Sequence, residues 1–143
     1  MAIAISGGST SFTSTISASP SANRTVTVPD ATFTVAASDA VQTFSASQRG
    51  TVTTDNDGSF DMNVTNNFKC TPTGSITLTF TNITAGQSGF ILLVNGSNYT
   101  VSAHANTKVA TGALTALSAT GTYLISYFSD GTNVFVVNSG ALA

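Results

Sequence analysis

The sequence predicts an all-β protein: an antiparallel β-sandwich or jelly-roll-like domain preceded by an extended N-terminal arm. Three observations favour this fold class. Thr and Ser together account for 44 of the 143 residues, whereas Glu and Trp are absent. Helices draw heavily on Glu, Lys, Arg, Ala and Leu, but Thr and Val favour strands. Polar and apolar residues also alternate with a period of two along several short segments that turn residues separate.

The length suits one domain of ordinary size. We divide the chain into residues 1–49, an N-terminal arm with short strands, and residues 50–143, the β-sandwich domain. Residues 1–24 are mostly small and polar, with Phe12 and Ile16 as possible anchors. Such a segment cannot bury enough apolar surface to become ordered by itself. We therefore expect an arm that binds a partner through Phe12 and Ile16; a free tail is the alternative.

Short strands are expected on both sides of this boundary. Residues 25–28 and 32–35 alternate polar and apolar side chains around a proline corner. In the domain, residues 51–54 and 60–64 flank the turn sequence at 55–58, which contains Asp, Asn and Gly. This pattern predicts a β-hairpin.

The middle of the domain contains two further strand signals. Residues 75–80 alternate cleanly, which predicts a strand with one apolar face. Residues 90–94 are continuously apolar, which predicts a strand buried on both faces. Asn95 and Gly96 follow at once, and an Asn-Gly pair favours a type I′ turn into a second strand at 97–101.

The last segments predict another hairpin. Residues 122–128 and 133–137 are strand-like and flank the turn sequence at 129–132. Residues 110–119 are the stretch most compatible with a helix, although Gly112, Thr111, Thr115 and the following Thr120 weaken that interpretation.

Composition excludes several classes of function. A net charge of −2 with four Lys and Arg residues cannot build a surface that follows a phosphate backbone, so no nucleic-acid partner is expected. One Cys and one His cannot form a Cys/His zinc site or an intrachain disulfide. The sequence has no apolar stretch of about 20 residues, so no membrane partner is expected. The first residues lack the basic and apolar regions of a secretory signal.

One acidic cluster could bind a cation. Asp55, Asp57 and Asp61 lie within seven residues and could offer oxygen ligands to Ca²⁺. The spacing departs from an EF-hand loop because Gly58 comes too early and no closing Glu follows. The alternative is a polar turn, in which Asp and Asn are common for conformational reasons. We expect the turn and no cofactor, and we keep the three aspartates as metal candidates.

No catalytic constellation is apparent in the sequence. His104 lies in a polar segment without a G-x-S-x-G nucleophile motif anywhere in the chain. Asp130 is the single acid after residue 61, so few carboxylates could orient this imidazole. Cys70 has the surroundings of a small, half-buried residue. We therefore expect a protein that is not an enzyme.

The distribution of charge indicates an assembly subunit. Residues 70–143 contain two charged side chains, Lys108 and Asp130. Soluble monomers usually keep charge on their surface, whereas the cores of interfaces are depleted of it. We expect a homo-oligomer. The alternative is a monomer that Ser, Thr and Asn keep in solution.

Four segments resemble virion proteins of tailed bacteriophages. They are TGSITLTFTN at 73–82, AGQSGFILLV at 85–94, GTYLISYFSDGTNVFV at 121–136 and NRTVTVPDA at 23–31. The first three resemble a recurring pattern of strands in such proteins, and the fourth resembles a short motif of tail-fibre shafts. The family's typical tryptophans are missing.

This resemblance implies a structural or adhesive protein of the outer virion surface, usually a trimer, without catalytic residues. A chain of 143 residues that begins at Met1 leaves little room for an attachment domain plus a shaft, which favours a capsid decoration (cement) protein. Its expected partners are further copies of itself and the major capsid protein or another virion protein. A short tail-fibre or head-fibre protein is the first alternative. A carbohydrate-binding receptor protein is the second, with Tyr99, Tyr123 and Tyr127 as stacking candidates.

Overall fold

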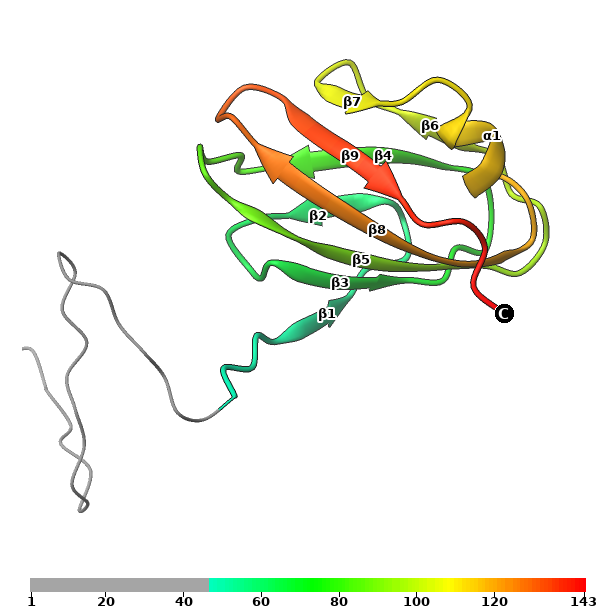
Figure 1. Cartoon of the computed structure of the whole chain (residues 1–143), viewed down its shortest axis with the longest axis horizontal. Coiled ribbons are helices and arrows are strands. Elements are labelled where there is room, and N and C mark those ends of the chain that lie inside the picture. Colours follow the sequence, from blue (N-terminus) through cyan, green and yellow to red (C-terminus); the bar gives the residue numbers. More distant parts are fainter. Residues whose placement is uncertain (1–46) are drawn as a thin grey trace, which may run out of the picture. The chain divides into compact units, whose positions relative to one another are not determined.

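A computed structural model describes residues 47–143 (Figure 1). These residues form strands and one short helix in the following order: β1 (Val52–Thr54), β2 (Ser59–Asp61), β3 (Asn67–Cys70), β4 (Ile76–Thr81), β5 (Ser88–Asn95), β6 (Val101–Ala103), β7 (Thr107–Val109), α1 (Ala113–Leu117), β8 (Gly121–Ser129) and β9 (Val134–Asn138). Apart from residues 47–49, the predicted arm at 1–49, with its strands and with Phe12 and Ile16, lies outside the described residues.

The strands form two sheets that face each other. One sheet has six strands in the order β1-β3-β5-β8-β9-β7, and the other has three in the order β2-β4-β6. From β1 to β6, consecutive strands alternate between the sheets, and each of β1 to β4 pairs in parallel with the strand two positions later. Phe68 of β3 lies beside Ile91 of β5, and Phe60 of β2 lies beside Phe80 of β4. This part of the chain is therefore stacked like the coils of a short solenoid.

The C-terminal part closes the larger sheet with antiparallel strands. β8 runs antiparallel to β5 from Gly121 to Phe128, and β9 returns antiparallel to β8. β7 then pairs with β9 in parallel at the edge. Figure 1 shows β3, β5, β8 and β9 side by side in this sheet. The hairpin predicted at 122–137 is confirmed.

The all-β prediction is confirmed, but the antiparallel sandwich or jelly roll is wrong. Among the described strands, five pairs are parallel and two are antiparallel. The hairpin predicted between 51–54 and 60–64 does not form, because its turn carries the chain from one sheet to the other. A period of two shows which side chains share a face, but it does not show whether the neighbouring strand is parallel.

The hydrophobic core lies between the sheets and is centred on aromatic rings. The ring of Phe60 in β2 lies 5.1 Å from that of Phe68 in β3 and 5.6 Å from that of Phe80 in β4. The ring of Tyr127 in β8 lies 5.1 Å from that of Phe80. These contacts join both sheets, and they have the tilted geometry that aromatic pairs prefer.

The strand predicted at 75–80 is confirmed as β4. Its apolar residues Ile76, Leu78 and Phe80 are buried in the core. The residues between them point outward, and the hydroxyl of Thr77 lies 2.8 Å from that of Ser102 on β6. The outer face of the three-stranded sheet therefore presents mainly hydroxyl groups, from Ser59, Thr77, Thr79, Thr81 and Ser102, together with the carboxylate of Asp61 beside Thr81.

The Asn-Gly turn predicted at 95–96 is wrong. Neither residue has the positive φ that a type I′ turn requires. The Asn95 side chain is instead buried, and its amide donates to the carbonyls of Tyr99 at 2.8 Å and Leu117 at 3.0 Å. Its oxygen accepts the backbone N–H of Tyr99. Asn95 thus ties the connection from β5 to β6 to the end of α1, which lies within the stretch predicted as most compatible with a helix.

Gly89, at the start of β5, permits a close approach of the Asn66 carbonyl. The carbonyl of Asn66 accepts hydrogen bonds from the N–H of Phe90 and from the hydroxyl of Tyr127, both at 3.0 Å. It passes directly over Gly89, where a Cβ atom would collide with this carbonyl and lie 2.7 Å from the Tyr127 hydroxyl oxygen. The neighbours are backbone and a buried ring, so neither can move aside cheaply.

We predict that Gly89→Ala lowers the free energy of unfolding by about 2–3 kcal/mol, because the added methyl group overpacks this contact. Urea denaturation measures the loss. Gly74→Ala is the matched control, because a Cβ atom there has no neighbour within 4 Å. Equal stability of the two variants would contradict the close approach.

We also predict that Asn95→Ala lowers the free energy of unfolding by about 2–3 kcal/mol, because it leaves buried backbone groups without partners. Asn95→Asp should not restore stability, since a carboxylate cannot donate to the carbonyls of Tyr99 and Leu117. Denaturation of both variants at pH 7 checks this. A stable Asp variant would mean that the two donated bonds contribute little.

Candidate functional site

β5 is apolar on both of its faces, but it is buried on one. Ile91 and Leu93 are 0% exposed, whereas Phe90 is 50% exposed and Leu92 is half-buried. The predicted burial of residues 90–94 on both faces is therefore wrong. One face of the strand meets the core, and the other lies at the surface of the described domain.

The strand register gathers apolar side chains from several strands on this outer side of the six-stranded sheet. Leu92 lies beside Leu124 of β8, and Phe128 of β8 lies beside Phe135 of β9. Phe128 is 51% exposed and Phe135 is 45% exposed. We call the whole set the apolar face: Val52, Phe90, Leu92, Leu124, Phe128, Phe135 and Val137.

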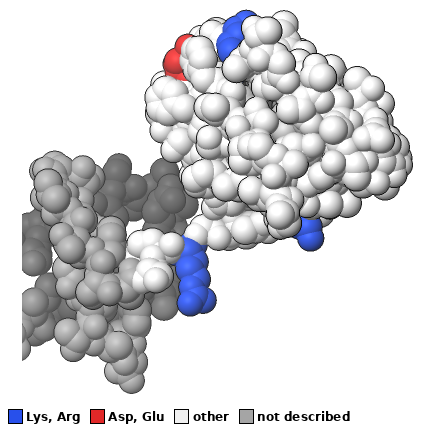
Figure 2. Space-filling model, turned by 45° about the vertical axis from the view of Figure 1, so that its right-hand side comes forward, with Lys and Arg blue, Asp and Glu red and all other residues white. Residues whose placement is uncertain are grey.

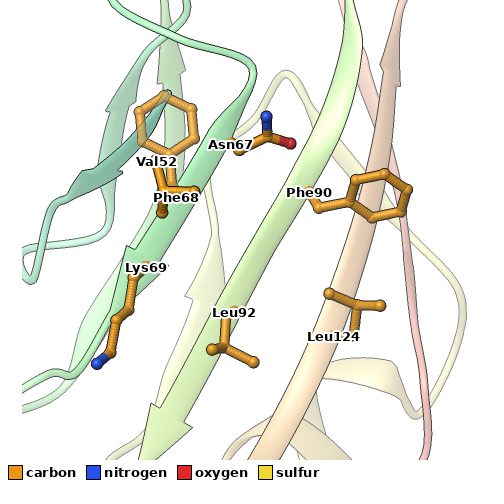
Figure 3. Close-up of a pocket in the computed structure, with 7 residues that line it drawn as sticks. All are labelled: Val52, Asn67, Phe68, Lys69, Phe90, Leu92 and Leu124. Atoms are coloured by element: carbon orange, nitrogen blue, oxygen red, sulfur yellow. The ribbon is translucent and has the colours of Figure 1, made fainter. Parts of the chain in front are cut away.

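The apolar face is hollowed over β3 and β5. The hollow has a volume of about 370 Å³ and is lined by Val52, Asn67, Phe68, Lys69, Phe90, Leu92 and Leu124. Figure 3 shows Phe90 and Leu92 on β5 and Leu124 on the neighbouring β8. A smaller hollow of about 190 Å³ lies over β8 and β9, where Phe128, Phe135 and Val137 line it. The two halves of the face thus differ in shape.

Charged side chains are scarce on the described surface, as the mostly white view in Figure 2 shows. On the strands of the six-stranded sheet, the outer side carries Lys69 on β3 and Lys108 on β7. The Lys108 ammonium donates to the carbonyl of Ala105 at 2.6 Å. Asp130 lies in the turn between β8 and β9, close to Phe128 in the sequence. On the outer side, β5, β8 and β9 therefore carry no charged side chain, whereas Lys69 lines the hollow beside Leu92 and Lys108 and Asp130 lie at the margin of the face.

The acidic cluster behaves as a set of turn residues. Asp55, Asp57 and Asp61 each accept a hydrogen bond from the backbone N–H two residues later. Asp61 also accepts from the amide of Asn82 at 2.7 Å, which holds the pKa of its carboxyl below the usual value. Burial and the neighbouring Asp57 raise the pKa of Asp55. Among residues 47–143, no three His, Cys, Asp or Glu side chains form a group that could hold a metal ion.

The two potential nucleophile or base residues lie in ordinary surroundings. Cys70 is fully buried, and burial with the nearby Asp55 and Asp57 raises the pKa of its thiol to about 12. A neutral thiol in the core is a poor nucleophile. His104 is exposed, and its Nδ1 lies 2.6 Å from the amide oxygen of Asn106.

The three tyrosines do not form a stacking surface. Tyr123 is 2% exposed and Tyr127 is 4% exposed, so both belong to the core. Their hydroxyls donate to the carbonyls of Ala119 and Asn66. Tyr99 alone of the three is partly accessible.

Comparisons of the chain with protein-family models, with curated proteins and with solved structures found no match. No helix within residues 47–143 is long and apolar enough to cross a membrane. The apolar face is therefore the strongest candidate for a functional site. A sequence signal for it exists in β5 and β8, where large apolar residues occupy positions on both sides of a strand.

We predict that stability falls as pH rises from about 9 toward 12. Burial raises the pKa values of the Cys70 thiol and the Tyr127 hydroxyl to about 12, so the folded state keeps both protons while the unfolded chain loses them. Their contribution is complete below the pKa of the unfolded thiol, about 8.5, and is lost as pH rises from there through the folded pKa values.

Urea midpoints between pH 7 and pH 11 measure this effect. Tyr127→Phe should reduce the slope with pH, although it lowers stability at every pH through the lost bond to Asn66. A Tyr127→Phe profile parallel to that of the unsubstituted protein would contradict the assignment.

Proposed function

We propose that this chain is a virion structural protein of tailed bacteriophages: a capsid decoration (cement) protein that binds the outer shell as a trimer and stabilises it. The apolar face is the observation that carries the proposal, because such a surface needs a covering partner. The resemblance of residues 73–94 and 121–136 to phage virion proteins supports the same class. The proposal includes no catalytic step and no cofactor.

The size of the apolar face supports a role in an assembly. Its three half-exposed phenylalanines alone leave on the order of 300 Å² of apolar surface accessible. Isolated soluble monomers rarely expose larger contiguous apolar patches unless these are functional. Scarcity of charged side chains is also typical of the cores of protein interfaces.

A decoration protein would stabilise a shell by bridging its subunits. Each bound trimer adds contacts that must break before neighbouring capsid subunits separate, so its binding free energy raises the barrier to rupture. In this proposal, residues 1–24 add contact area by binding a neighbouring copy or the shell, with Phe12 and Ile16 as anchors. Binding must then offset an ordering cost of about 1–2 kcal/mol per residue, which favours pairing along an existing strand edge.

A short tail-fibre or head-fibre protein is the second candidate, and the parallel stacking of β1 to β6 favours it. Parallel coils can be extended by further coils along one axis. Among the described strands, β1 and β2 each have one neighbour, so the stack is open at that end. A receptor-binding protein that stacks sugars on tyrosines has less support, since Tyr123 and Tyr127 are core residues.

Addition of the purified full chain to capsids that lack it tests the proposal. We expect saturable binding to the shell, visible by electron microscopy, and a higher temperature of capsid rupture. A chain without residues 1–24 should bind the shell at least tenfold more weakly. A tenfold decrease corresponds to a loss of about 1.4 kcal/mol in binding free energy. Binding to tails or host cells and not to shells would favour the second candidate. Undiminished binding of the shortened chain would refute the role of the arm.

A further inference from the structure

We propose that the apolar face joins copies of this chain to one another. The half over β8 and β9, with Phe128 and Phe135, packs into the hollow over β3 and β5 of the next copy. This inference rests on the proposed function, which requires a homotrimer, and it adds the surface and the mode of contact.

The scarcity of charge on the face favours a largely apolar partner. A charged side chain placed against Phe90 or Leu124 would lose its water without gaining a partner, which costs several kcal/mol. Beside Leu92 the charged group is Lys69, which an acidic side chain could pair. A second copy of this chain meets both requirements, because it offers apolar side chains on β8 and β9 and the carboxylate of Asp130 in the turn between them. Covering one face with another also removes the exposed apolar surface of both copies at once.

The apolar face supplies the large side chains of a contact between subunits. Stable interfaces bury about 800 Å² on each partner. The face offers several hundred Å² from large side chains, which a ring divides between two contacts, so neighbouring polar residues must supply the rest of each interface. Asn67 and Ser126 lie within the face, between Val52 and Phe90 and between Phe90 and Val137, and can hydrogen-bond across it.

The unlike halves of the face favour a ring over a two-fold pair. A trimer uses a heterologous contact, in which two different patches of each copy meet, whereas a two-fold dimer places a patch against itself. The half over β3 and β5 contains the larger hollow, with Val52 and Leu92 in its lining. The half over β8 and β9 presents the half-exposed rings of Phe128 and Phe135, which are neighbours in register.

The charged side chains of the face agree with this arrangement. Lys69 lines the hollow, and Asp130 lies in the turn beside Phe128 and Phe135. Backbone N–H groups of the turn lower the pKa of the Asp130 carboxyl, so it is ionised at neutral pH. Lys108 lies next to Phe135, but its ammonium is engaged by the carbonyl of Ala105. Lys69 of one copy and Asp130 of the next can therefore set the register of the contact.

Sedimentation of the full chain at about 50 μM tests the surface, since a contact with a Kd well below that concentration stays assembled there. We expect a trimer for the unsubstituted chain. The double substitution Phe128→Thr and Phe135→Thr should weaken assembly by about 30-fold or more, as for central interface residues. Val64→Thr is the matched control, because Val64 is similarly exposed but lies between β2 and β3, away from the face.

Unchanged assembly of the double variant would overturn the inference while leaving a trimeric decoration protein in place. Circular dichroism shows whether the variant is folded. If it is not, Leu92→Thr in the hollow provides the same test from the other half of the contact. A monomeric unsubstituted chain would overturn the inference as well, and the capsid-binding experiment then decides the proposed function separately.

Oxidative cross-linking tests the mode of contact. In a variant with both Leu92→Cys and Phe128→Cys, the ring predicts disulfides between copies that yield covalent dimers and then trimers on a denaturing gel. Cys70 does not interfere, because it is buried. Each single-cysteine variant should remain uncross-linked. Covalent dimers without trimers would show a two-fold pair, and an intact trimer without any cross-links would show that another surface joins the copies.

Discussion

The two sheets depend on one cluster of aromatic contacts in the core. Phe60 contacts Phe68 across the core and Phe80 within its own sheet, and Phe80 contacts Tyr127 of the larger sheet. Because the described domain contains no disulfide and few charged side chains, burial of apolar area is its main source of cohesion. The strands that carry these rings come from both the parallel coils and the antiparallel end, so the cluster makes one domain of two types of pairing.

Sequence periodicity predicted which residues of β4 face the core, and turn composition predicted the hairpin of β8 and β9. Sequence periodicity could not predict the partner of each strand, since the same alternation fits parallel and antiparallel neighbours. The Asn95–Gly96 pair was misleading because its local preference for a turn yields to burial of the Asn95 amide. Gly89 carried no sequence signal, because its role depends on the carbonyl of Asn66, more than twenty residues earlier.

The apolar face shows that the sequence is equally limited in predicting which surfaces other molecules cover. Continuous apolar residues in β5 indicated burial on both sides, and the outer side is instead accessible in the described domain. A sequence cannot distinguish side chains that a second sheet covers from those that another molecule covers, since both environments select large apolar residues. The scarcity of charge after Cys70 was the more informative signal, because it applies to the surface as a whole.

The outer side of the three-stranded sheet bears on how the protein responds to salt. Its hydroxyls, such as those of Thr77 and Ser102, neither titrate near neutral pH nor attract counterions. Interactions between charged groups weaken as ionic strength rises, because mobile ions screen them, but hydration of hydroxyl groups does not depend on such screening. The hydroxyl groups of this side should consequently keep their affinity for water from dilute media to brine, and on these three strands mobile ions screen the carboxylate of Asp61 alone. This is a useful property for any protein that must remain dispersed where the salt content of its surroundings changes.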